Sequence, residues 1–294
     1  MAHTAKPILK TKTIIGEGSL WDPKAQVLYW LDIGAQRVFV YDPQSGENKS
    51  FEIGGYPSSI VPRESGGVAI TVINGYAALN LETGSIETLA QVEGNITANR
   101  FNDGKCDPAG RYWAGTMPFD LSQKKKGGLY RLEPDLSVIN VLSEVSCSNG
   151  IVWSLDNQWM YYIDSLTQEV HRYDYVLETG NISNRKTVVV IPEKVGFPDG
   201  MAIDEAGNLW VALYQGGAVH CYHPNTGKLL DQVQVPGAEL VTSCAFGGRK
   251  LKDLYITTAC CEYSEEDWLK NPNAGNLFKV EMKVGGIPAV SFKG

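Results

Sequence analysis

The chain has 294 residues, a formal charge of −7 and 43% hydrophobic residues, which is the composition of an ordinary globular protein. The mild acidity and the lack of a basic stripe argue against binding to a phosphate backbone, so we expect no nucleic-acid partner. The first residues lack the apolar core of a secretory signal, and no stretch reaches the roughly 20 apolar residues of a membrane span. The sequence therefore predicts a cytoplasmic protein with no membrane partner.

A hairpin pattern recurs along the chain, roughly every 45 residues. Each copy has a short apolar strand, a polar turn rich in Asp, Gly, Pro or Asn, and a second strand of aromatic or β-branched residues. In chain order, the six copies are residues 20–33, 60–72, 101–117, 151–165, 202–214 and 244–259.

A second strand-turn-strand segment follows each copy. These segments are residues 38–51, 77–89, 128–141, 169–183, 218–233 and, less clearly, 276–290. Four strands per repeat with almost no helical periodicity predict an all-β fold, a six-bladed β-propeller, because a large β-sandwich does not require one hairpin type at a fixed period. We expect residues 1–294 to form one propeller domain, with a leader at residues 1–12 that is flexible in part.

Polar residues occur at equivalent positions of the six repeats, where each first strand begins. The first strand of a propeller blade lines the central channel, so these residues should meet at one mouth of the channel. They are Glu17, Ser58 or Ser59, Arg100 with Asn102, Asn149, Asp199, and Thr242 or Ser243. Polar groups tolerate a shared wet cavity better than the apolar space between blades. The pattern predicts a functional site in the channel.

Three of these residues, Glu17, Asn149 and Asp199, offer oxygen ligands, and two of them are anionic. Oxygen ligands suit hard divalent cations such as Ca²⁺, Mg²⁺ or Mn²⁺. One Asn-Gly or Asp-Gly pair alone indicates only a turn, but three such positions in three blades favour a metal site in the central channel. Only four histidines are present, and their positions support neither a Ser-His-Asp arrangement nor a cysteine nucleophile.

Six motifs occur in order along the chain: GEGSLWD, NRFNDGKCDPAGRYWAGTM, SNGIVWS, YYIDS, FPDGMAID and LWVALYQGG. From about Gly16 to the C-terminus, the chain resembles the senescence-marker-protein, gluconolactonase and luciferin-regenerating-enzyme family. The resemblance implies one divalent cation in the channel, held by Glu17, Asn149 and Asp199. Calcium is the first choice, with zinc, manganese or magnesium as alternatives. It also implies hydrolysis of a small-molecule sugar lactone, with Arg100 and Asn102 as the substrate-binding pair.

One departure from the family pattern follows Gly-Thr-Met, where this chain has Pro118, Phe119 and Asp120 and then a short loop. We expect Asp120 to replace a glutamate as a substrate-binding residue, with less reach.

The expected mechanism has the cation stabilise the oxyanion that forms when water attacks the lactone, with the catalytic Asp199 as the base. Two alternatives stay open. One is a calcium-binding regulatory protein without significant catalysis, and the other is a different hydrolase on the same scaffold, phosphotriesterase-like or luciferin-regenerating. We expect a monomer or a weak dimer.

Overall fold

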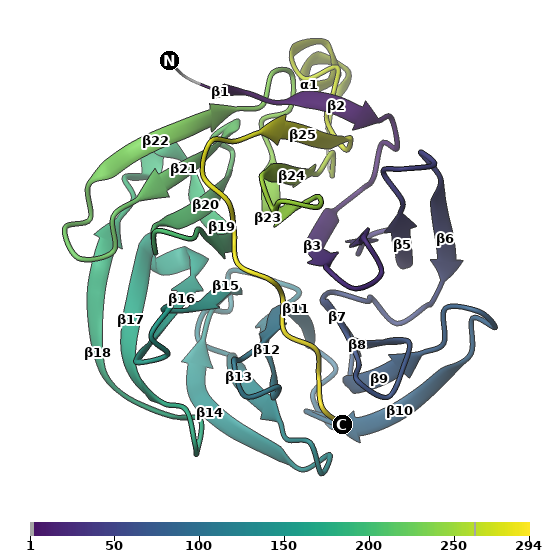
Figure 1. The fold of residues 1–294 in the computed structure, drawn as a ribbon, viewed down its shortest axis with the longest axis vertical. Coiled ribbons are helices and arrows are strands. Elements are labelled where there is room, and N and C mark those ends of the chain that lie inside the picture. The colour runs from purple at the N-terminus through teal and green to yellow at the C-terminus, as the bar shows by residue number, and fades with distance from the viewer. Residues whose placement is uncertain (1–2, 262) are drawn as a thin grey trace.

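The computed structural model describes residues 3–261 and 263–294. These residues form six sheets set around a centre, as Figure 1 shows, which confirms the predicted all-β, six-bladed propeller. The described helices are short: η1 (Ser165–Thr167), η2 (Glu193–Val195) and α1 (Glu265–Lys270). None of them has the length and apolar character needed to cross a membrane.

Each of the first three blades is an antiparallel sheet whose strands follow in chain order from the channel outward. The first blade has β3 (Gly16–Asp22), β4 (Val27–Asp32), β5 (Arg37–Tyr41) and β6 (Asn48–Glu52). The second has β7 (Ile60–Pro62), β8 (Val68–Val72), β9 (Gly75–Leu79) and β10 (Ile86–Gln91). The third has β11 (Asn99–Cys106), β12 (Tyr112–Pro118), β13 (Gly127–Leu132) and β14 (Val138–Val145).

The remaining blades continue around the channel. The fourth has β15 (Ser148–Trp153), β16 (Trp159–Asp164), β17 (Glu169–Val176) and β18 (Asn181–Val190). The fifth has β19 (Phe197–Ile203), β20 (Leu209–Tyr214), β21 (Ala218–Tyr222) and β22 (Leu229–Gln234). The sixth has β23 (Val241–Gly247), β24 (Asp253–Thr258) and β25 (Leu277–Glu281). Each of the twelve predicted hairpin segments except 276–290 coincides with two consecutive strands.

The N-terminal segment supplies the outer strand of the sixth blade, which corrects one expectation. The fourth strand of the sixth blade is β2 (Lys6–Leu9), which pairs with β25, so the second half of 276–290 does not form the expected strand. The short β1 (His3–Thr4) pairs with β22 of the fifth blade. Within the predicted leader, residues 3–4 and 6–9 therefore contribute backbone pairs to two blades. Residues 1 and 2 lie outside the described residues.

Buried aspartates explain the polar turns of the repeat. In three blades, an aspartate ends or follows the innermost strand and accepts a backbone N–H of the turn: Asp22 from Lys24, Asp107 from Ala109 and Asp204 from Ala206. The second oxygen of Asp107 and of Asp204 accepts the indole N–H of a tryptophan on the next strand. Such turns satisfy the backbone donors that a tight hairpin leaves unpaired.

The C-terminal segment crosses one face of the propeller. Figure 1 shows it as the yellow chain that leaves β25 and passes over the centre toward the second and third blades. Gly286 bridges to Asp204, and Phe292 bridges to Arg63 and is fully buried. The segment therefore covers one mouth of the channel.

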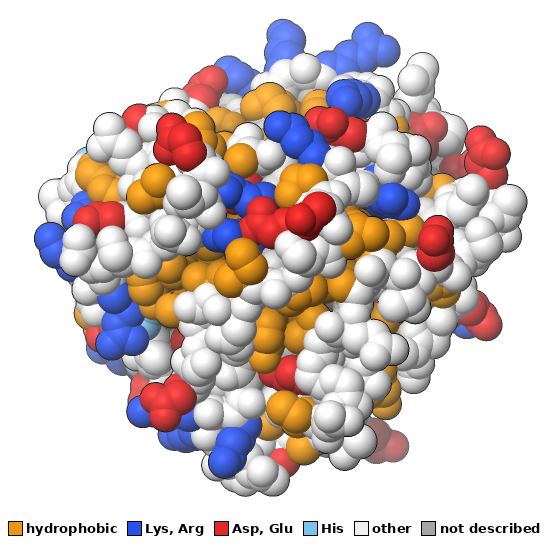
Figure 2. Space-filling view, turned by 90° about the horizontal axis from the view of Figure 1, so that it is seen from below, with side chains coloured by type: hydrophobic (Ala, Val, Ile, Leu, Met, Phe, Trp, Pro, Cys, Tyr) orange, Lys and Arg blue, Asp and Glu red, His pale blue; other side chains and the backbone are white. Residues whose placement is uncertain are grey.

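The outer surface carries charges of both signs. Figure 2 shows basic and acidic side chains interspersed on one side of the molecule, with hydrophobic side chains between them. No broad area of a single charge is seen on that side.

We expect removal of residues 1–9 to lower the melting temperature by several degrees, because the sixth blade would lose its outer strand. In large domains, about 1 kcal/mol corresponds to roughly 2–4 °C. Thermal unfolding followed by circular dichroism measures the effect. Lys6→Ala is the control, since it keeps the backbone pairs of β2 while changing an exposed side chain. An unchanged melting temperature in the truncated chain would contradict a closing role for this segment.

Candidate functional site

Irregularities in the innermost strands bring the site residues together. In five blades, the pairing of the innermost strand shifts register close to its start: in β3, β11, β15, β19 and β23. Asn102, Asn149 and Asp199 lie within the shifted stretches, and Glu17 lies at the edge of another. Residues at such bulges leave the regular ladder, so their side chains can be re-aimed. The repeated bulge therefore turns polar groups from different blades toward one place.

The glycines beside the predicted ligands serve two different purposes. Gly18 lies in the shifted stretch of β3 and has a φ of 60°, a conformation that favours glycine. Gly150 lacks this conformation, and a Cβ there would lie 2.5 Å from the Cβ of Met201. At Gly200 a Cβ would lie 2.7 Å from the hydroxyl of Ser243. At these two positions glycine is needed because neighbouring innermost strands approach closely.

Two buried carboxyl groups, those of Glu17 and Asp199, form the centre of the site. Glu17 is 4% exposed and Asp199 is 7% exposed. Burial and the charge of Asp103 raise the pKa of Glu17 to about 8. Burial and the charge of Glu17 raise the pKa of Asp199 well above its usual value. Among the described residues, Asp199 Oδ1 is buried without any hydrogen-bond partner. The charge of Arg100 and, for Glu17, the Gly18 N–H that donates to Oε2 at 2.7 Å oppose these shifts, yet both pKa values stay raised.

A hydrogen-bonded chain links the other predicted residues. Arg100 Nη1 donates to Asn102 Oδ1 at 2.8 Å, and Asn102 Nδ2 donates to Asn149 Oδ1 at 3.1 Å and to the Ser148 carbonyl at 2.8 Å. Asn149 Nδ2 donates in turn to Ser165 Oγ at 2.7 Å. These bonds fix which atom of each amide is oxygen. They leave a lone pair on Asn149 Oδ1 for a further partner.

Arg100 faces the carboxyl pair. Burial lowers the pKa of its guanidinium, and neighbouring groups that include Glu17 and Asp199 oppose this shift. Its Nη1 is held by Phe101 and Asn102, whereas no hydrogen bond to its Nη2 is found among residues 3–261 and 263–294. Half of the guanidinium fork is thus available to a ligand.

Asp103 is a third acidic residue of the site that the motif analysis did not single out. It is 8% exposed, and its Oδ1 accepts the N–H of Gly104 at 2.7 Å. Burial raises its pKa, while the charge of Lys105 opposes the shift. Its place directly after Asn102 in an innermost strand was the available sequence signal.

The structure does not bring every predicted residue into this cluster. Asp120 is exposed, and its carboxylate accepts hydrogen bonds from Ser122 N at 3.0 Å and Gln123 Nε2 at 3.4 Å within its own turn. Serine and threonine residues at the rim hold strands together instead: Ser58 Oγ bonds Thr71 Oγ1 at 2.9 Å. Ser59, Thr242 and Ser243 likewise form hydrogen bonds within or between blades.

The cluster has a donor set that fits a hard divalent cation. No group of three or more His, Cys, Asp and Glu side chains able to hold a metal is found in the described part of the chain, so a cation would need the amide oxygen of Asn149. The two carboxyl groups and this amide supply oxygen only. The partnerless Asp199 Oδ1 and the repulsion between the acids are what a cation would relieve.

Comparison with known proteins identifies the family. The family model described as the SMP-30/Gluconolactonase/LRE-like region matches residues 15–260. The chain is 41% identical to regucalcin of Gallus gallus over 286 residues, which cover 95% of each chain. It is 39% identical, over 97% of each chain, to YvrE of Bacillus subtilis, whose name proposes a sugar lactone lactonase. A solved luciferin-regenerating enzyme is 34% identical with a TM-score of 0.90, covering 98% of this chain and 100% of its own.

The chain therefore belongs to the SMP-30, gluconolactonase and luciferin-regenerating-enzyme family, as its motifs indicated. The family match spans the innermost strands of all six blades, so it includes every bulge described above.

Asp199→Asn should stabilise the protein when divalent cations are removed. Because the carboxyl pKa values are raised in the folded state, the stability that these groups contribute falls as pH rises from the unfolded value through about 8. Removing one acid abolishes the repulsion, so the melting temperature at pH 8 should rise by roughly 2–4 °C for each kcal/mol relieved. Calorimetric scans in a chelating buffer measure this change.

The gain should shrink as pH falls toward about 5, because the raised pKa values mean that the acids become increasingly protonated in the folded wild-type protein. Asp120→Asn is the matched control, because it removes an exposed carboxylate whose pKa is lowered by its own turn. A melting temperature that falls in Asp199→Asn at pH 8 would show that the two acids are not in conflict.

Proposed function

We propose that the protein hydrolyses sugar lactones to the open-chain acids and that this activity requires one divalent cation, calcium in the first place. The partnerless, buried oxygen of Asp199 beside the second buried carboxyl of Glu17 carries the proposal. Glu17, Asn149 and Asp199 would hold the cation. When bound, it would supply Lewis-acid stabilisation of the negative charge that develops on the lactone carbonyl oxygen.

The chain's own residues would bind the substrate and handle the proton. Asp199 is the candidate base for the attacking water, because its carboxyl group is buried beside the position proposed for the cation. The unused Nη2 of Arg100 would donate to a sugar hydroxyl or to the carboxylate product.

Asn102 fits a positioning role better than direct contact with the substrate. Its carboxamide is already engaged by Arg100, Asn149 and the Ser148 carbonyl. It would therefore hold the guanidinium and the amide ligand in place. Asp120, which lies exposed on the loop after β12, would reach the substrate only after a movement of that loop.

Support for a lactone as substrate comes from the family. The family description includes gluconolactonase, and YvrE carries a lactonase name. The name luciferin-regenerating enzyme, borne by a structural relative, keeps a different reaction on the same scaffold as the second candidate.

The direct test is hydrolysis of glucono-1,5-lactone, measured as acid release at a rate above that of the spontaneous reaction. We expect turnover by the wild-type protein to be lost after chelation and restored by Ca²⁺. Asp199→Ala should remain folded and inactive, since its side chain lies in the channel and not between blades. Cation binding without turnover on lactones would favour a calcium-binding protein, and activity that survives chelation would contradict the proposed dependence.

Arg100→Lys separates substrate binding from cation binding. The substitution keeps the positive charge and loses the fork of donors, so kcat/KM should fall by roughly ten- to a hundredfold, as expected for loss of a charge-assisted hydrogen bond. Cation affinity, measured by calorimetry, should stay close to that of the wild-type protein. If kcat/KM is unchanged, Arg100 is not a substrate residue.

A further inference from the structure

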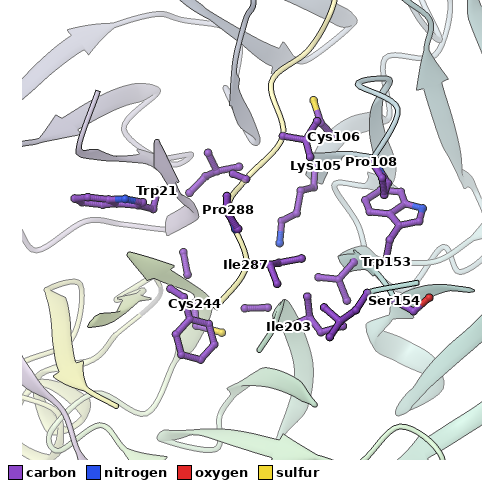
Figure 3. A pocket seen from close by; sticks show the side chains of 18 of the residues that line it. Trp21, Lys105, Cys106, Pro108, Trp153, Ser154, Ile203, Cys244, Ile287 and Pro288 are labelled. Atoms are coloured by element: carbon purple, nitrogen blue, oxygen red, sulfur yellow. The ribbon is translucent and has the colours of Figure 1, made fainter. Parts of the chain in front are cut away.

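A cavity of about 330 Å³ lies at the end of the channel opposite the candidate site, shown in Figure 3. The innermost strands begin at the carboxyl pair, and their last residues line this cavity, among them Trp21 of β3, Trp153 of β15 and Ile203 of β19. On β11, Lys105 lies three residues beyond Asn102, a separation of about 10 Å along a strand. The volume falls within the roughly 300–1,000 Å³ of small-molecule sites.

The C-terminal segment forms the outer wall of this cavity. Ile287 and Pro288 line it, and Figure 3 shows their segment crossing in front of the strands. The wall is fixed on both sides, because Gly286 N donates to the Leu251 carbonyl at 2.8 Å and Phe292 N donates to the Pro62 carbonyl at 2.8 Å. Leu155 and Ile287 remain 48% and 39% exposed, so the cavity has an apolar edge open to solvent.

Lys105 is the single charged side chain among the described residues that line the cavity. Figure 3 shows its nitrogen pointing toward the middle of the space. Its ammonium donates to the Met201 carbonyl at 2.8 Å, and the described residues provide no other hydrogen bond or ion pair for it. An ammonium group has three donors, so two stay available to a ligand. Burial lowers the pKa of the Lys105 ammonium, and the nearby charge of Asp103 opposes this shift.

We propose that this cavity binds a small monocarboxylate with an apolar body, its carboxylate on Lys105 Nζ and its hydrocarbon among Trp153, Ile203 and Ile287. A cation would be repelled by Lys105. A sugar would place most of its hydroxyl groups against apolar walls, because Ser19, Ser154 and Asn157 are the other polar side chains of the described lining. A multiply charged anion would find a single ammonium group to neutralise it, and the nearby charge of Asp103 would repel its further negative charges. A monoanion with a hydrocarbon tail matches both the charge and the walls.

The test is a titration with octanoate in a chelating buffer, so that no cation at the opposite mouth can recruit the carboxylate. Calorimetry should show binding to the wild-type protein, and octan-1-ol should bind at least tenfold more weakly. Lys105→Met keeps the aliphatic length and removes the charge, so it should lose at least tenfold in octanoate affinity. Glu17→Gln, altered at the opposite mouth, should bind octanoate as the wild-type protein does.

A second pair of variants keeps the test decisive if Lys105→Met does not fold. Ile287→Glu places a competing carboxylate on the partly exposed wall of the cavity, and Ile287→Gln is the uncharged control of equal length. The glutamate variant should lose octanoate binding, and the glutamine variant should retain most of it. No binding to the wild-type protein, equal binding of octanoate and octan-1-ol, or equal binding by the two Ile287 variants would overturn the proposal.

Discussion

The close approach of two buried acids, Glu17 and Asp199, is the constraint on which the rest of the channel depends. Both pKa values are raised by burial and by neighbouring negative charge, so holding the acids together opposes folding whenever both are ionised. The blades can impose this arrangement because the acids lie at or within bulges of β3 and β19, while the next strands, β4 with β5 and β20 with β21, pair in regular ladders. The stable outer sheet thus supports a destabilised centre, a division common at functional sites.

Some polar groups of the site are fully bonded to other parts of the chain, and others keep a hydrogen-bonding position free for a ligand. Asn102 is saturated by its neighbours, and the rim hydroxyls hold strands together. Asp199 Oδ1 and Arg100 Nη2 lack partners within the described chain, one as an acceptor and the other as a donor. A bound cation would satisfy the first, and a sugar hydroxyl or the carboxylate of the product would satisfy the second. The other mouth of the channel carries the opposite charge, because its one charged side chain among the described lining residues is the basic Lys105, which lies among mostly apolar residues.

Local sequence was sufficient to predict the propeller and to place Glu17, Asn149 and Asp199 on innermost strands of three blades, because both depend on a hairpin that repeats with the same turn chemistry. Their joint role as cation ligands stays a prediction. The closing strand β2 could not be found in this way, since its partner β25 lies at the far end of the chain and its four residues have no repeat of their own. The engagement of Asn102 and the outward placement of Asp120 depend on side-chain contacts that spacing does not encode. Comparison of the six repeats could have indicated Asp103, because it directly follows Asn102 in the sequence.

The central claim is that the paired acids form a cation site, and calcium titration of the wild-type protein beside Glu17→Gln tests it most directly. The account predicts one binding event near neutral pH that releases protons, because Glu17 has a pKa of about 8 before the cation binds, and an affinity at least tenfold lower in the variant. Calcium affinity that is equal in the two proteins would place any cation elsewhere and contradict the account.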